Sequence, residues 1–176
     1  MKNRNLIMMF FLLIISAGCS KNTQDEEIVE NDTILPVISA LEEEHLDQSI
    51  LSFFNKELPQ NRYENSKGFF TSIAEDQEDC IIINSEEEFQ NAYNGDYALP
   101  TIDFQHYTLI LGKLYEDASY LFQGQYLTKE GNGYSLVLCF RRESAVADML
   151  PFYYWGIYPR INNGNVTVKK EIMNHW

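Results

Sequence analysis

The sequence has few of the residues that carry most enzyme chemistry or bind nucleic acid. Its 176 residues include three cysteines, three histidines and 13 lysines and arginines, against 26 aspartates and glutamates, so the formal net charge is −13. Nucleic-acid binding depends on Lys and Arg side chains that neutralise phosphates. The acidic balance therefore excludes a nucleic-acid partner, and its commoner consequence is solubility.

The sequence motifs of the common enzyme classes are also missing. There is no Gly-x-Ser-x-Gly, His-Glu-x-x-His or Cys-x-x-Cys motif and no glycine-rich phosphate loop. The histidines, His45, His106 and His175, lie far apart in the sequence. Asp103 and His106 are three residues apart, but both precede a predicted strand, where we expect their side chains to point to opposite faces. We therefore expect no catalytic centre, no metal site and no cofactor.

The longest apolar run lies near the N-terminus and is short. Leu6 to Ile15 is a run of ten apolar residues, whereas a helix that spans a bilayer needs roughly 20. Lys2 and Arg4 precede this run and make its start positive. A positive start, a short apolar core and small residues after it are typical of a signal peptide for export, here residues 1–18.

The residues at the end of this run resemble a known export motif. Ser16-Ala17-Gly18-Cys19 is similar to the lipobox of bacterial lipoproteins, although Ser16 stands where Leu is usual. The resemblance implies that Cys19 receives a diacylglycerol, that the signal is cleaved before it and that the new amino terminus is acylated, for example with palmitate. Several acyl chains make such an anchor permanent. An ordinary secretory signal with a coincidental cysteine is the alternative, and the chain is exported in both cases.

The residues after Cys19 predict a tether and then one domain. Residues 19–35 are polar and acidic without periodicity, which is typical of a disordered spacer. Their acid cluster, Asp25 to Glu27, resembles the surface-export signal of Bacteroidota lipoproteins. We therefore expect an outer-membrane lipoprotein that faces either the periplasm or the cell surface. Residues 36–176 show no repeat and no second linker, which favours a single domain.

The patterning of this domain predicts an α+β fold. Apolar residues recur at three and four from Pro36 to Leu58, which indicates an N-terminal amphipathic helix. Ser85 to Tyr93 begins with a Ser-x-x-Glu capping box and predicts one short helix. The remaining chain alternates as six or seven strands, which we expect to form a mainly antiparallel sheet. Three of the expected strands are a short one over Phe69 to Ala74, a fully apolar and therefore central one over Cys80 to Ile83, and one over Tyr107 to Leu111 that is covered on both sides. We also expect a turn at Gly131 to Gly133 and a hairpin at Asn163-Gly164.

Two cysteines remain in the exported domain, Cys80 and Cys139. In an oxidising compartment one disulfide between them would stabilise the fold by roughly 4 kcal/mol in the chain-entropy model. Both also lie beside aliphatic runs, where a free cysteine packs as a small hydrophobic residue. The sequence leaves both alternatives open.

The aromatic run Phe152 to Tyr158 is the most distinctive feature of the domain. Alternation places Tyr153 and Trp155 on the face opposite Phe152, Tyr154 and Tyr158. Because one set must pack on the core, Tyr153 and Trp155 are the candidate exposed surface for a glycan or peptide. The alternative is that both sets are core.

Residues 80–140 show a second, weaker resemblance. Ser85-x-x-Glu88-Phe89 followed by Asp103-Phe104 and a strand is similar to the PrcB-type domain, although Gly131-Asn132-Gly133-Tyr134 lies downstream of the usual Gly-Gly-Tyr position. The resemblance implies an antiparallel sheet, a flanking helix and a protein partner.

Together these patterns favour a lipid-anchored envelope module that binds a protein or glycan. The alternatives are a structural accessory subunit of an envelope complex and, third, an enzyme of unrecognised type.

Overall fold

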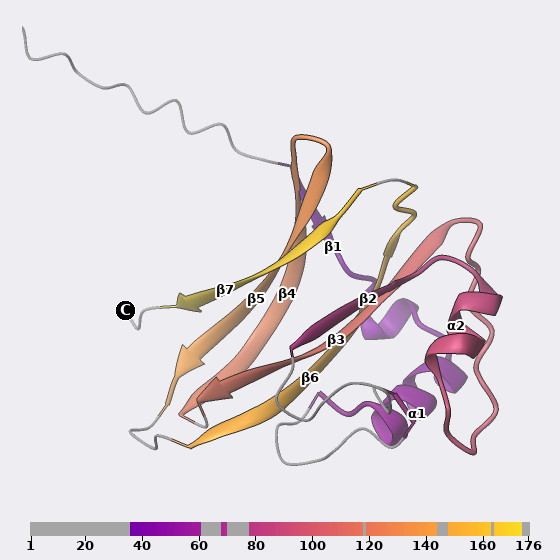
Figure 1. Cartoon of the computed structure of the whole chain (residues 1–176), viewed down its shortest axis with the longest axis horizontal. Coiled ribbons are helices and arrows are strands. Elements are labelled where there is room, and N and C mark those ends of the chain that lie inside the picture. Colours follow the sequence, from indigo (N-terminus) through magenta and orange to yellow (C-terminus); the bar gives the residue numbers. More distant parts are fainter. Residues whose placement is uncertain are drawn as a thin grey trace, which may run out of the picture. The chain divides into compact units, whose positions relative to one another are not determined.

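In the part of the chain that the structure describes, seven strands form two sheets that pack face to face. The computed structural model describes residues 36–60, 68–69, 78–117, 119–143, 148–162 and 164–173; the predicted signal peptide and tether lie outside these ranges. The larger sheet has the order β1-β4-β5-β7 and the smaller one the order β2-β3-β6 (Figure 1). The strands are β1 (Val37–Ser39), β2 (Asp79–Ile83), β3 (Tyr107–Asp117), β4 (Tyr120–Glu130), β5 (Gly133–Arg142), β6 (Met149–Pro159) and β7 (Val166–Met173).

One hydrophobic core fills the space between the two sheets. Every second residue of β5 points into it, namely Leu136, Leu138 and Phe140, and all three are fully buried. Ile110 of β3 and Tyr154 of β6 meet them from the smaller sheet. This alternation of inward and outward residues is what a strand with one core face dictates.

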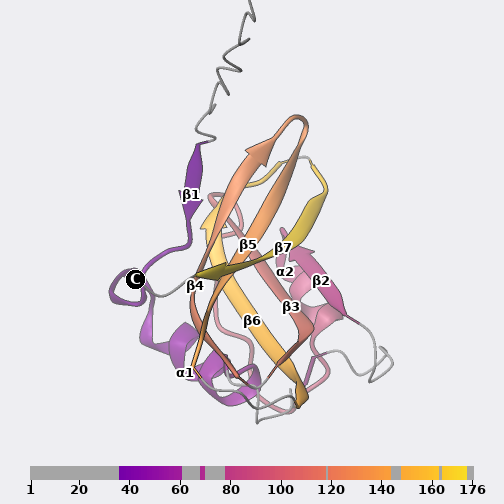
Figure 2. The same ribbon diagram turned by 90° about the vertical axis from the view of Figure 1, so that its left-hand side faces the viewer.

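A second core lies on the other face of the smaller sheet, where two short helices cover it. Phe54 of α1 (Gln48–Glu57) and Phe89 of α2 (Glu86–Ala92) pack there against Leu109, Leu111 and Trp155. The smaller sheet is therefore buried on both faces, between helices and the larger sheet (Figures 1 and 2). The prediction that the strand beginning at Tyr107 is covered on both sides is confirmed.

The β1–β6 side of the sandwich is closed by hydrogen bonds to the outer edge of β6. The Ile157 carbonyl accepts from the Leu41 N–H at 2.8 Å. The Trp155 carbonyl accepts from the side-chain amides of Gln60, at 2.7 Å, and Gln125, at 2.5 Å. Since Gln125 belongs to β4, this contact joins the two sheets directly.

The N-terminal part of the domain differs from the predicted helix over residues 36–58. The chain first forms β1, whose β-branched Val37 and Ile38 pair with β4. A 3-10 helix, Glu43–His45, follows. α1 begins only after Asp47, which caps the helix because its carboxylate accepts from the Ser49 N–H at 2.7 Å. Apolar periodicity predicted the buried Ile50, Phe53 and Phe54 but not the helix start, because the strand pairing of β1 depends on a distant partner.

The short helix predicted at Ser85 is confirmed as α2. The Ser85 hydroxyl accepts from the Glu88 N–H at 3.1 Å, and the Glu88 carboxylate accepts from the Asn84 N–H at 2.5 Å. The turn after β4 is confirmed as well, and Gly131 adopts a φ of 58° there, a conformation that favours glycine.

Three predictions about pairing are wrong. The strands form two sheets instead of one. Cys80 to Ile83 belongs to an edge strand, since β2 pairs with β3 alone among the described strands; its apolar run reflects cover on both faces. The hairpin at Asn163-Gly164 is absent among the described strands, because β7 runs parallel to β5 and does not pair with β6. Turn residues show that a chain reverses but not which strand it joins.

The strand predicted over 69–74 lies, except for Phe69, outside the described residues.

Candidate functional site

The predicted aromatic surface is part of the core. Tyr153 and Trp155 are each only 7% exposed. The Trp155 ring stacks on Phe54 of α1 with centroids 4.2 Å apart and planes 16° apart. The helices that cover this face of β6 were not evident from the strand pattern, so the prediction of an exposed platform is wrong and its core alternative holds.

Cys80 and Cys139 carry free thiols. Cys80 of β2 packs against the core between the sheets. Cys139 belongs to the outward set of β5 residues, and its sulfur lies 3.9 Å from a carboxylate oxygen of Glu171. The two side chains lie on opposite sides of the larger sheet, which is why this structure has two reduced thiols.

Asp103 and His106 come together, contrary to the sequence-based prediction. Their side chains meet at 2.7 Å because they lie in a turn before β3 instead of in the strand. The hydrogen bond to His106 lowers the pKa of Asp103 below its usual range. Both side chains are exposed, and the His106 ring otherwise meets the edge of Tyr107. An exposed Asp-His pair of this kind stabilises a turn.

A cleft of about 410 Å³ opens between β2 and β7, on the side of the sandwich opposite the β1–β6 closure. Residues 78–80 form one wall, and Val166, Val168 and Lys170 form the other. Leu114 and Tyr154 from the core between the sheets lie between the walls. The volume lies within the range of ligand pockets, and the open lining is more polar than apolar.

Burial keeps two groups of the cleft, Cys80 and Tyr154, in their neutral forms. Burial raises the pKa of the Cys80 thiol to about 11, although a hydrogen bond to Tyr154 opposes part of this shift. Burial also raises the pKa of Tyr154, whose hydroxyl donates to the Asp79 carbonyl at 3.2 Å. The thiol and the phenol therefore both stay protonated, and the charged groups of the lining are Glu78, Asp79, Lys113 and Lys170.

Charged groups lie at the cleft margin. Lys170 of β7 lies 3.3 Å from Glu116 of β3, whose side chain is only 6% exposed. This ion pair bridges the two sheets across their open side. The Glu78 carboxylate accepts from the Tyr115 N–H at 3.2 Å. No sequence motif marks these residues, since the pairing of β2 with β3 brings Glu78 to Tyr115 and the packing of the two sheets brings Lys170 to Glu116.

A smaller hollow, of about 190 Å³, gathers His45, Asp47 and Asp103 over an apolar floor. Both carboxylates already have partners: Asp47 caps α1, and Asp103 binds His106 and the Gln105 N–H. The hollow is therefore a gap between α1 and β3 whose acids serve the fold.

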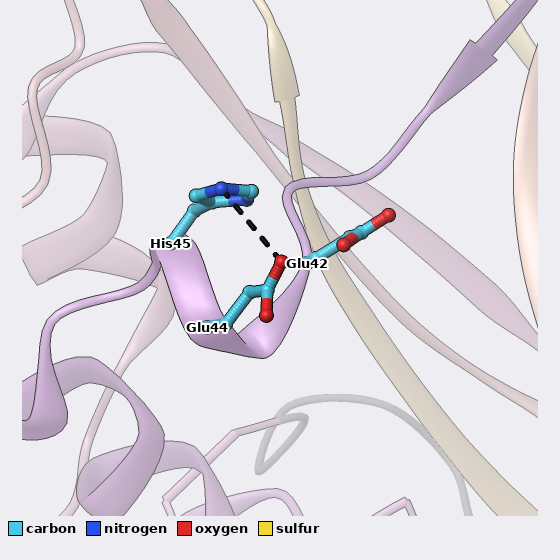
Figure 3. A group of neighbouring side chains, drawn as sticks. All are labelled: Glu42, Glu44 and His45. Atoms are coloured by element: carbon cyan, nitrogen blue, oxygen red, sulfur yellow. Dashed lines mark ion pairs between the residues drawn. The ribbon is translucent and has the colours of Figure 1, made fainter.

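Glu42, Glu44 and His45 form the one group of at least three potential metal ligands found in the described part of the chain. Figure 3 shows them around the 3-10 helix. His45 and Glu44 form an ion pair at 3.9 Å. All three are exposed. Nothing buried orients them toward a shared point, so they resemble a solvated acidic surface.

Comparison of the chain with protein-family models, with curated proteins and with solved structures found no match. Among the described residues, no helix has the length and apolar character required to cross a membrane.

Proposed function

We propose that this chain is a lipid-anchored lipoprotein of the outer membrane and acts as a non-enzymatic binding module for an envelope protein or glycan. The anchor rests on the N-terminal residues, where a short apolar run leads to Ser16-Ala17-Gly18-Cys19. Acyl chains on Cys19 hold the chain at the membrane, and the acidic residues that follow act as a spacer.

The cleft between β2 and β7 is the observation that carries the binding role. It replaces the aromatic face of Tyr153 and Trp155, which lies under α1. The apolar side chains of Leu114, Val166 and Val168 favour an apolar part of a ligand, while Asp79 and Lys113 add polar groups to the lining. Such a division between apolar burial and a few orienting charges is usual for ligand sites.

The chemistry of the cleft favours binding over catalysis. A cysteine with a pKa of about 11 is mostly protonated at neutral pH and is a poor nucleophile. Lys170 and Glu116 are occupied with each other. These groups position a ligand better than they transfer protons to it.

Substitution of Cys19 tests the anchor. In the Cys19→Ala variant the acylation site is gone, so we expect the protein to move from the membrane fraction to the soluble fraction after cell fractionation. Ser20→Ala is the matched control and leaves the protein in the membrane fraction. Continued membrane retention of Cys19→Ala would contradict the proposal.

A variant that fills the cleft tests the binding role. Val168→Trp places a large ring between the walls, so binding to positive spots of a glycan array and a peptide array should fall at least tenfold. Lys129→Trp adds the same ring at an exposed site of β4 and should leave binding unchanged. Arrays on which the unsubstituted chain binds nothing, or on which both variants bind equally, argue against the cleft.

A further inference from the structure

β7 is the outermost strand of the larger sheet, and its second edge has no partner among the described strands. It pairs with β5 along Val166–Met173. Two of its side chains are large, apolar and exposed: Ile172 is 40% and Met173 47% accessible. An unpaired edge with exposed apolar residues is a template for another strand.

The sequence of β7 is nearly self-complementary when read antiparallel to itself. Val168, Lys170 and Ile172 lie on the face that looks toward the core, in register with Leu136, Leu138 and Phe140 of β5. Lys169 and Glu171 lie on the other face, where within the same chain Lys169 pairs with Glu130 at 2.6 Å and Glu171 accepts from the Tyr126 hydroxyl at 2.9 Å. In an antiparallel pair, two residues that lie opposite each other point to the same side of the sheet. A twofold axis perpendicular to the sheet must therefore pass through a position where one residue lies opposite the same residue of the other copy.

Centring this axis on Lys170 sets opposite charges and apolar residues against each other. Lys169 then faces Glu171 of the partner subunit, and Val168 faces the partner's Ile172, each contact occurring twice. Centring on Lys169 instead would oppose Val168 to a lysine, and centring on Glu171 would oppose two glutamates. Cross-strand pairs of opposite charge or apolar character are favourable, and like charges are not.

In this register Lys170 also faces the partner's Lys170. The repulsion between these two positive charges is offset within each subunit. The ammonium of Lys170 already lies 3.3 Å from the buried Glu116 carboxylate. Each lysine therefore enters the pairing as part of an ion pair that points toward the smaller sheet.

We propose that two copies of this chain associate through antiparallel β7–β7 pairing centred on Lys170, which joins their larger sheets into one eight-stranded sheet. The contact is isologous, since the same strand serves both subunits. It covers Ile172 with the partner's Val168. The pairing uses the outer backbone edge of β7, although Val168 and Lys170 also line the cleft, so it is tested by cross-linking and sedimentation, which need no ligand.

Cross-linking tests the register directly. Residues paired with themselves lie within disulfide range, so the full-length Lys170→Cys variant should form a covalent dimer in native membranes under oxidising conditions. Lys129→Cys, on an exposed part of β4, should not. A dimer that Lys129→Cys forms as readily, or no dimer from Lys170→Cys, overturns the proposal.

Charge reversal provides a second test that does not depend on thiols. The Cys19→Ala chain is studied by sedimentation at about 0.5 mM, where dissociation constants up to about 1 mM are visible. Lys169→Glu and Glu171→Lys each oppose like charges twice, and should weaken the dimer about tenfold or more. The double variant restores opposite charges and should recover most of the association.

Lys56→Glu makes the same charge change on α1 and should leave association unchanged, and circular dichroism confirms that each variant is folded. A monomeric parent chain, single variants that associate like the parent, or a double variant weaker than both single variants would overturn the proposal.

Discussion

The two thiols of the domain lie in different surroundings, and this predicts different reactivity. Burial raises the pKa of Cys80 from an ordinary value of 9.0 to about 11. The pKa of Cys139 is also raised, by burial and then by the neighbouring Glu171, but Cys139 lies near the surface. A raised thiol pKa means the protonated, unreactive form persists to higher pH.

We therefore predict that both thiols are free and that Cys139 reacts first. At pH 8 the thiolate fraction of Cys80 is about a hundredfold below that of an ordinary cysteine, and its alkylation is slowed at least as much. Timed alkylation followed by mass spectrometry of the peptides distinguishes the sites, with the unfolded chain as the control in which the rates converge. A mobility change on reduction that disappears in Cys139→Ala would show a bridge instead.

At the scale of the element, α1 makes the face of Trp155 into core. Phe54 is fully buried, and its ring stacks on Trp155 and also meets Phe53 edge-on at 5.2 Å. This one helix decides whether the aromatic strand β6 is a surface or an interior.

Phe54→Ala should therefore destabilise the domain by about 3–5 kcal/mol, because it removes a large ring and leaves a cavity. Ser52→Ala, on the exposed side of the same helix, should change stability by less than about 0.5 kcal/mol. Urea unfolding measures both. Near-equal effects of the two substitutions would mean that α1 does not cover Trp155 in solution.

At the scale of the whole molecule, β3 belongs to both cores. Leu109 points toward the helices and Ile110, the next residue, points toward the larger sheet, and both are fully buried. Because one strand supplies both cores, neither core can be lost while the other keeps its native packing.

We therefore predict one cooperative unfolding transition. Leu109→Ala and Ile110→Ala should each destabilise by about 2–5 kcal/mol, and both should shift the whole transition. Far-ultraviolet circular dichroism and tryptophan fluorescence should give coincident curves for parent and variants. Two separated transitions in either variant would show that the cores unfold independently.

Local signals in the sequence predicted local features well. Ser85 and Glu88 predicted the start of α2, and Gly131 predicted the turn between β4 and β5, because caps and turns depend on residues a few positions apart. Alternation likewise predicted the strands from Tyr107 onward. The candidate site was not predicted: Lys170 and Glu116 are 54 positions apart in the sequence, and Tyr153 was predicted to be exposed.

The sequence by itself determined the N-terminal motif that ends at Cys19, the acidic charge and the order of strands and short helix, since each is written in neighbouring residues. Only the tertiary structure decided which strands pair, that Tyr153 and Trp155 lie beneath α1, and that a cleft opens between β2 and β7. Pairing and burial depend on side chains far apart in the chain, whose complementarity no local pattern records.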